Sequence, residues 1–88
     1  LIKLGDRCQI GGHRGIVAFL GDEVEGLPGG FWVGIRYDEP VGKNDGAVKG
    51  KRFFECPDGY GSFQRPANVA VGDYPEEDDP FAESEDEI

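Results

Sequence analysis

The 88-residue chain is long enough for one small domain, and its ten aromatic residues let a compact β domain bury enough apolar surface. Its net charge is −9, but residues 1–72 are neutral, and residues 73–88 hold nine acidic groups and no basic one. A tail of this sign repels phosphate and argues against nucleic acid as a partner. No apolar run approaches the roughly 20 residues of a membrane span, so no membrane partner is expected.

Six short segments with strand composition are separated by turns rich in glycine and proline. In chain order we expect strands over residues 7–10, 16–20, 31–37, 52–56, 60–65 and 68–71. The sequence therefore predicts an all-β fold: a small, strongly bent antiparallel sheet or an open SH3-like barrel, with long glycine-rich loops. We expect the domain to cover residues 1–72 and the acidic tail, residues 73–88, to be flexible.

The strongest predicted strand, residues 31–37, places Val33 and Ile35 on one face and Trp32 and Gly34 on the other. If Val33 and Ile35 face the core, Trp32 lies outward beside Gly34, whose missing side chain leaves open space next to the indole. An outward tryptophan is either a platform for a ligand or a cover over the end of a small barrel. The pattern leaves both interpretations open.

The long loop of residues 38–50 contains the candidate site, Gly42-Lys43-Asn44-Asp45-Gly46. The two glycines let the backbone take positive φ at either end, which holds the polar residues between them on a tight, exposed loop. Lys43 offers a cation and Asn44 offers amide donors, while Asp45 can close an Asx turn onto the loop's own N–H groups. A cation and an amide displayed together suit a carboxylate, but a merely solvated hairpin loop would have the same composition.

Catalysis is not expected, because the chain has one histidine, His13, which lies in a predicted turn. No triad can be built from it. Cys8 and Cys56 lack metal-ligand spacing, so no metal site is expected, and no feature points to a cofactor. We expect both cysteines to be free thiols in a reducing compartment, with a single disulfide as the alternative.

Aromatic and basic side chains instead favour a cleft that captures a short acidic peptide with an apolar end. The rings that can line it are Phe31, Trp32, Phe54 and Phe63, and the donors at its rim are Lys43, Asn44 and Arg65. The alternative is a generic SH3-like scaffold that binds proline-rich or internal peptide segments.

These residues resemble a known family, the CAP-Gly domain of cytoskeleton-associated proteins. The pentapeptide at 42–46 matches that family's signature letter for letter, and the flanking stretches 30–34, 50–56 and 61–63 also follow its pattern. The likeness runs from about Gly5 to Gly72. It implies a small β domain that grips the C-terminal Glu-Glu-Tyr or Glu-Glu-Phe of α-tubulin and of microtubule end-binding proteins, in a cytoplasmic, cytoskeleton-associated setting.

The resemblance also implies roles for individual residues. Trp32 and Phe63 would hold the terminal aromatic residue, Lys43 and Asn44 the terminal carboxylate and acidic side chains, and Arg65 a further acid. Phe31 and Phe54 match as groove walls, and Gly42, Asp45 and Gly46 set the geometry of the loop. The sequence around residues 68–78 resembles the members of the family that fold tubulin and take its dimers apart, which implies tubulin-folding cofactor E as a partner.

The end of the tail, Glu85-Asp86-Glu87-Ile88, has the form of the ligand itself, with acids followed by an apolar residue. Sixteen residues can stretch to about 50 Å, enough to reach a cleft on the same body or on a neighbouring copy. Tethering gives an effective concentration around millimolar, so even a weak self-ligand could compete. We expect either a reversible brake of this kind or simply a solvated acidic run.

Overall fold

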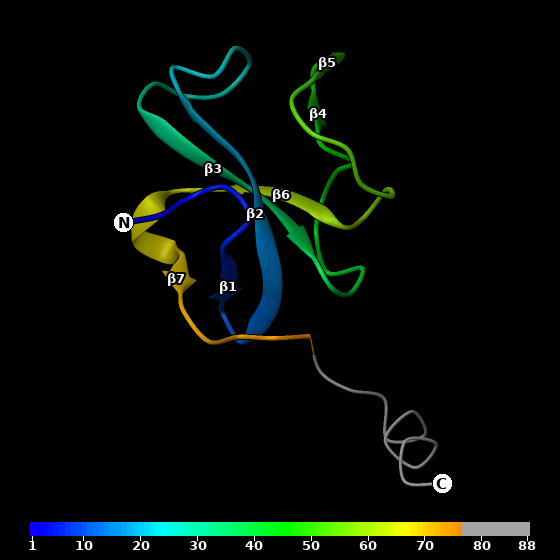
Figure 1. The fold of residues 1–88 in the computed structure, drawn as a ribbon. Coiled ribbons are helices and arrows are strands. Elements are labelled where there is room, and N and C mark those ends of the chain that lie inside the picture. The colour runs from blue at the N-terminus through cyan, green and yellow to red at the C-terminus, as the bar shows by residue number, and fades with distance from the viewer. Residues whose placement is uncertain (77–88) are drawn as a thin grey trace, which may run out of the picture.

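The structure, a computed structural model, describes residues 1–76 and contains a bent five-stranded antiparallel sheet in the order β6–β3–β2–β1–β7 (Figure 1). A separate two-stranded ribbon, β4–β5, stands away from this sheet. The all-β prediction is confirmed, and within residues 1–76 no helix has the length and apolar character to cross a membrane. The elements are β1 (Arg7–Ile10), β2 (His13–Asp22), β3 (Phe31–Tyr37), β4 (Ala47–Val48), β5 (Lys51–Arg52), β6 (Gly61–Gln64), the 3₁₀ turn η1 (Pro66–Asn68) and β7 (Ala70–Val71).

Two local features shape the sheet. Gly11 and Gly12 both have positive φ, 58° and 89°, and form the two-residue turn between β1 and β2. The register between β2 and β3 shifts between Val17 and Phe19, which marks a β-bulge. A bulge bends and twists its strand, so the shift accounts for part of the expected bend.

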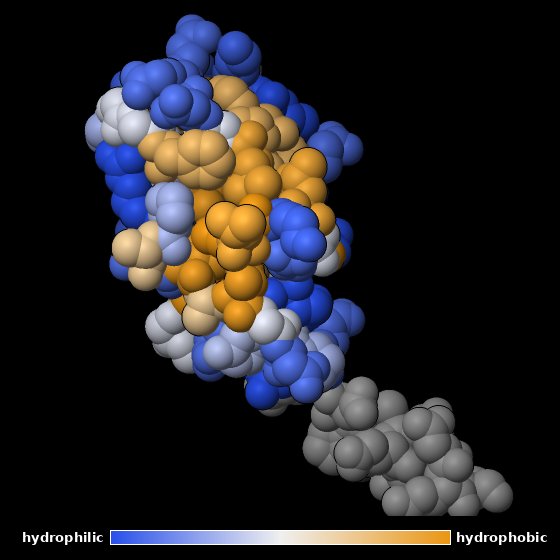
Figure 2. All heavy atoms as spheres, turned by 60° about the vertical axis from the view of Figure 1, so that its left-hand side comes forward, coloured by the Kyte–Doolittle hydropathy of each residue, from blue (hydrophilic) through white to orange (hydrophobic). Residues whose placement is uncertain are grey.

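The core lies on one face of the sheet, as the alternation in residues 31–37 predicts. Val33 and Ile35 are fully buried and Tyr37 is nearly so, and they pack with three residues from other strands and loops, Cys8, Val17 and Val69. Apolar residues also reach the surface, and Figure 2 shows them gathered in a band on one side with hydrophilic residues on both flanks. The most exposed large apolar side chains of the described chain are Leu1, Leu4, Phe31 and Val41.

Most of the predicted strands are present with shifted ends. β1 and β3 match residues 7–10 and 31–37, while β2 is longer than the expected 16–20 and β6 shorter than the expected 60–65. The segment 68–71 is divided between the end of η1 and β7. The strand predicted over 52–56 is wrong: only Lys51–Arg52 pairs with β4, because the N–H groups of Phe53 and Phe54 both turn to the carbonyl of Gly46 (2.9 and 3.3 Å).

The second face of β3 is covered by aromatic rings. A Cβ atom added at Gly34 would lie 2.6 Å from Cε1 of Phe54 and 2.8 Å from Cβ of Phe19. The open space expected beside Trp32 is therefore not there, because a ring from a distant loop fills the place of the missing side chain. Phe19, Phe53, Phe54 and Phe63 form this aromatic cluster, with ring centroids 5.3 to 6.1 Å apart.

The first residues of the tail lie against the body. Arg7 donates from Nε to the carbonyl of Tyr74 (2.7 Å), and Arg14 donates to the carbonyl of Pro75 (2.9 Å). The Arg14 guanidinium also lies 6.0 Å from the centroid of the Tyr74 ring. Residues 73–76, which we call the strap, are therefore held by two arginines of the sheet. The expected flexibility of the rest of the tail concerns residues 77–88, outside the described part.

Candidate functional site

The loop of the candidate site is anchored on the first residue of β6. The N–H groups of Lys43 and Asn44 both donate to the carbonyl of Gly61 (2.7 and 3.0 Å), and the Gly61 N–H donates back to the Asn44 carbonyl (2.8 Å). Gly46 has positive φ (95°) as predicted, but Gly42 does not. A side chain at Gly42 would overlap the backbone of Gly61, so that glycine is required for close approach and not for its φ angle.

Hydrogen bonds inside the loop use its side-chain acceptors. The Asn44 Oδ1 accepts from the N–H of Gly46 (2.9 Å), and the Asp45 Oδ1 accepts from the N–H of Ala47 (3.2 Å), which is the Asx turn expected of Asp45. Arg52 pairs with the other Asp45 oxygen (3.1 Å). This hydrogen bond from Arg52 is the main reason that the pKa of Asp45 lies below its ordinary value.

What the loop presents outward is donors. Within residues 1–76 the exposed ammonium of Lys43 and the Nδ2 amide of Asn44 make no hydrogen bond or ion pair. Since the neighbouring Oδ1 and carboxylate oxygens are occupied inside the loop, an anion meets the donors without competition from them. The arrangement is suited to a carboxylate.

The aromatic cluster lies beside this loop. Gly46 packs so closely on Phe54 that a side chain there would overlap the Phe54 carbonyl. Phe54 is 8% exposed, whereas Phe63 is half-buried and lies opposite Gly34 in the sheet. Sequence reasoning found these two rings and missed Phe19 and Phe53. For Phe53 the signal was its place directly before Phe54, but for Phe19 only the long-range packing on Gly34 identifies it.

Trp32 lies at the far end of the same face and is half-buried. The Arg65 guanidinium lies 3.8 Å from the centroid of its ring and donates to the carbonyls of Gly29 (2.9 Å) and Phe31 (3.3 Å). The indole Nε1 donates to the carbonyl of Pro28 (2.8 Å). Arg65 is thus a stacking partner of Trp32 as well as a donor, and it fixes the loop before β3.

The β3–β6 register sets the spacing of the predicted site. Gly61 lies opposite Arg36 and anchors the loop of residues 42–46, which we call the donor loop. Phe63 lies opposite Gly34, and Arg65 follows β6 with an extended backbone (φ −71°, ψ 147°). Four extended residues from 61 to 65 cover about 13 Å. The structure therefore brings the loop of Lys43 and Asn44 to one end of a row of rings, which begins with Phe54 and Phe63 and ends with Trp32. Arg65 lies at the Trp32 end. Phe31 is 42% exposed at the edge.

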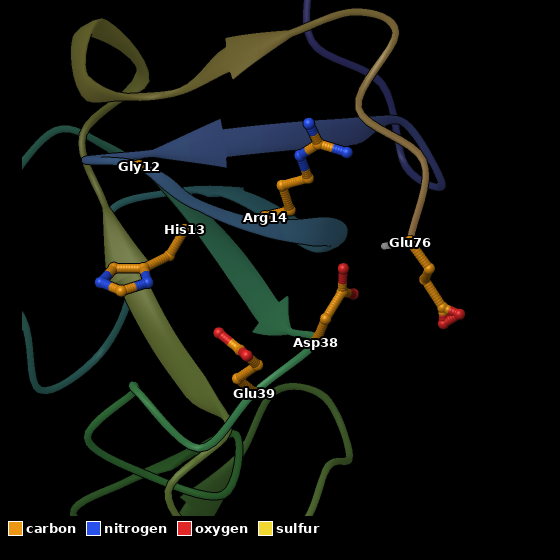
Figure 3. Close-up of a pocket in the computed structure, with 6 residues that line it drawn as sticks. All are labelled: Gly12, His13, Arg14, Asp38, Glu39 and Glu76. Atoms are coloured by element: carbon orange, nitrogen blue, oxygen red, sulfur yellow. The ribbon is translucent and has the colours of Figure 1, made fainter. Parts of the chain in front are cut away.

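Two recesses lie elsewhere on the described body. One of about 210 Å³ is formed at the β1–β2 turn, the end of β3 and the strap, and Figure 3 shows the carboxylates of Asp38 and Glu39 and the side chains of His13 and Arg14 around it. The other, of about 270 Å³, shares Asp38 and Glu76 with the first. Neither of these two recesses is lined by a predicted site residue.

The two cysteines are free thiols, Cys8 buried in the core and Cys56 half-buried. Burial raises the pKa of Cys8 to about 11 and also raises that of Cys56. In residues 1–76 no group of three or more His, Cys, Asp or Glu side chains could hold a metal ion.

The chain is similar to a known class of protein in both sequence and fold. Residues 4–69 match the family model of the CAP-Gly domain, so the chain belongs to the CAP-Gly domain family. The solution structure of the CAP-Gly domain in human kinesin-like protein KIF13B superposes with a TM-score of 0.73 at 36% identity, over 83% of this chain and 72% of that one.

The particular resemblance is to tubulin-folding cofactor B. The chain is 59% identical over 86 residues to that protein of Arabidopsis thaliana, covering 96% of this chain and 35% of the relative. It is 50% identical over 82 residues to that of Mus musculus, covering 88% and 33%. The chain thus spans about a third of the length of these curated relatives.

Proposed function

We propose that this chain is a non-catalytic module that captures acidic C-terminal tails of the Glu-Glu-Tyr or Glu-Glu-Phe type, such as the tail of α-tubulin. One observation carries the proposal: the donors of Lys43 and Asn44 have no partner in the described chain and lie at one end of a row of aromatic rings. The other end of the row is marked by the cation of Arg65. An acidic peptide with an aromatic end and a free carboxylate matches this order of groups.

The interactions available give weak, reversible binding. Each charge-assisted hydrogen bond to a carboxylate contributes about 1.5–3 kcal/mol when it is partly desolvated. Two such bonds and one buried ring reach roughly micromolar affinity after the cost of association is deducted. Because the donors are exposed, the affinity should fall with rising salt.

The similarity to tubulin-folding cofactor B supports a role in tubulin folding. We propose that this role extends to taking tubulin dimers apart. In that role the partners are α-tubulin, tubulin-folding cofactor E and, through the same C-terminal motif, microtubule end-binding proteins. The setting is the cytoplasm and the cytoskeleton. The acidic residues Glu85, Asp86 and Glu87 with Ile88, which lie outside the described part, are proposed from their sequence as a competing self-ligand.

The test compares one acidic, Tyr-ended peptide in three forms: with a free C-terminus, with a C-terminal amide, and without the final aromatic residue. We expect at least tenfold weaker binding for the second and third forms, since each removes a group that the site recognises. Equal binding of all three would contradict the proposal and favour an SH3-like scaffold that binds proline-rich or internal segments. A pull-down with α-tubulin that has or lacks its final aromatic residue extends the test to the whole partner.

A further inference from the structure

On the outer edge of β6, one residue has a backbone N–H and C=O without a hydrogen-bond partner in residues 1–76. β6 is an edge strand of the five-stranded sheet, paired only with β3 within it. The N–H of Tyr37 donates to the carbonyl of Tyr60 (2.8 Å), whose own N–H donates to Pro57. The two residues lie one step beyond the Arg36–Gly61 pair, so this bond sets the alternation of the antiparallel ladder. Because hydrogen-bonded and non-hydrogen-bonded pairs alternate, Ser62 and Gln64 also direct their backbone groups at β3, whereas Gly61 and Phe63 direct theirs outward.

The outward groups of Gly61 are already used by the donor loop, since Lys43 and Asn44 both donate to its carbonyl and Asn44 accepts from its N–H. The outward N–H and C=O of Phe63 have no hydrogen-bond partner in residues 1–76. Backbone groups without a protein partner are rarely buried, so these two face solvent. They lie at the middle of the row of rings.

We propose that the captured peptide binds as an added antiparallel strand on the edge of β6, with its last residue paired to the backbone of Phe63. This inference rests on the proposed function and specifies how the peptide is held. The terminal residue donates its N–H to the Phe63 carbonyl, and its carboxylate accepts from the Phe63 N–H. The main chain of the ligand thus supplies binding energy, and its side chains supply selectivity.

The direction of the added strand follows from the position of the donor loop. β6 runs from Gly61 away from Lys43 and Asn44, so only an antiparallel peptide has its C-terminus at those donors. Asn44 already makes an antiparallel bridge to Gly61, and the peptide extends the same edge. A parallel peptide would bring its carboxylate to the Arg65 end, and its upstream acids would then meet Lys43.

The pairing also decides which side chains of the peptide touch the rings. Residues directly opposite each other in a sheet share a face, so the terminal aromatic residue opposite Phe63 joins the aromatic cluster. The next residue points to the other face. The third residue from the end lies opposite Arg65, whose backbone is still extended and whose guanidinium uses two of its five N–H groups on Gly29 and Phe31.

The experiment replaces single peptide amides by esters, which removes one N–H with little change of shape. In an acidic, Tyr-ended peptide titrated into the full chain, an ester at the amide of the last residue should weaken binding about tenfold. An ester at the preceding amide, which points away from β6, is the matched control and should change binding less than twofold. Equal losses at both positions would overturn the added strand.

Amide hydrogen exchange of the protein gives a second readout. The Phe63 amide should exchange faster than that of Gln64, which faces β3, in the free chain, and should slow at least tenfold when peptide saturates the site. No slowing of Phe63 on binding overturns the inference. Failure of the unmodified peptide to bind would instead overturn the proposed function.

Discussion

The change Asn44→Asp isolates the donor on which the proposed function depends. It keeps the Oδ1 that accepts from the N–H of Gly46 (2.9 Å), so the loop retains its internal bond, but it replaces the outward amide by a carboxylate oxygen. The lost charge-assisted hydrogen bond costs about 1.5–3 kcal/mol. Repulsion between two carboxylates about 4 Å apart adds about 1 kcal/mol at a solvated surface.

The sum of about 2.5–4 kcal/mol corresponds to roughly 70- to 900-fold weaker binding. The assay is calorimetric titration of the Tyr-ended acidic peptide at physiological salt, with unfolding by denaturant measured in parallel. The free energy of unfolding should change by less than about 1 kcal/mol, because the loop's bonds remain. Asn68→Asp makes the same chemical change on exposed η1 and should alter binding less than twofold. Unchanged affinity of Asn44→Asp, or an equal loss in Asn68→Asp, would refute the reasoning.

Four further outcomes are expected. Lys43→Gln should weaken peptide binding about tenfold or more, whereas Lys49→Gln, which changes an exposed lysine of the neighbouring turn, should alter it less than twofold. Equal losses of affinity for the two variants would mean that binding depends on the protein's overall charge and not on Lys43. Gly34→Ala should lower the free energy of unfolding by about 1–3 kcal/mol in a denaturant titration, because its Cβ would lie 2.6 Å from the Phe54 ring, and an unchanged value would contradict that packing. The Cys8 thiol has its ordinary pKa of 9.0 in the unfolded chain and a pKa of about 11 when buried, so the unfolded state loses its proton first and the free energy of unfolding falls by up to about 2.7 kcal/mol between pH 9 and pH 11. Denaturant unfolding of Cys8→Ala should lack this part of the pH dependence. A chain ending at Glu76 keeps the strap and should bind the peptide more tightly than the full chain, and equal affinities at low salt would eliminate the self-ligand brake.

Local patterns sufficed for the central strands of the fold. In residues 31–37 the alternation of large apolar residues matches a strand with one buried face, and the burial of Val33 and Ile35 agrees with it. Gly11-Gly12 is typical of a tight turn because few other residues take positive φ without strain, and the two have φ of 58° and 89°.

The errors arise where distant segments meet. Phe53 and Phe54 have strand composition, but their N–H groups bond to Gly46 and their rings cover the face of Gly34, contacts that no local pattern contains. The two glycines of the loop look equivalent in sequence, yet Gly46 serves a positive φ and Gly42 a close approach to Gly61. The sequence shows that both positions are glycine, but the reason that each must be glycine is found only in the tertiary packing.

In the predicted site, too, some features follow from local sequence and others depend on tertiary contacts. Lys43 and Asn44 could be proposed from sequence because a cation and an amide on a tight loop have a chemical meaning by themselves. The order in which they meet the rings, with Phe63 between them and Arg65, depends on the β3–β6 register and could not be inferred from the loop. The stacking of Arg65 on Trp32 is likewise a tertiary contact, and it leaves Trp32 less open than an isolated platform would be.

The aromatic cluster serves the fold and the proposed site at once, and this limits which changes can separate them. Phe54 is 8% exposed and packs on both Gly34 and Phe63, so truncating it removes core packing together with any ligand contact. The outward donors of Lys43 and Asn44 and the outward backbone groups of Phe63 make no hydrogen bond within residues 1–76, so the fold does not depend on them. Loss of binding after a change in them, with stability kept, therefore reports on the peptide alone, whereas loss after a change in the rings reports on the fold as well.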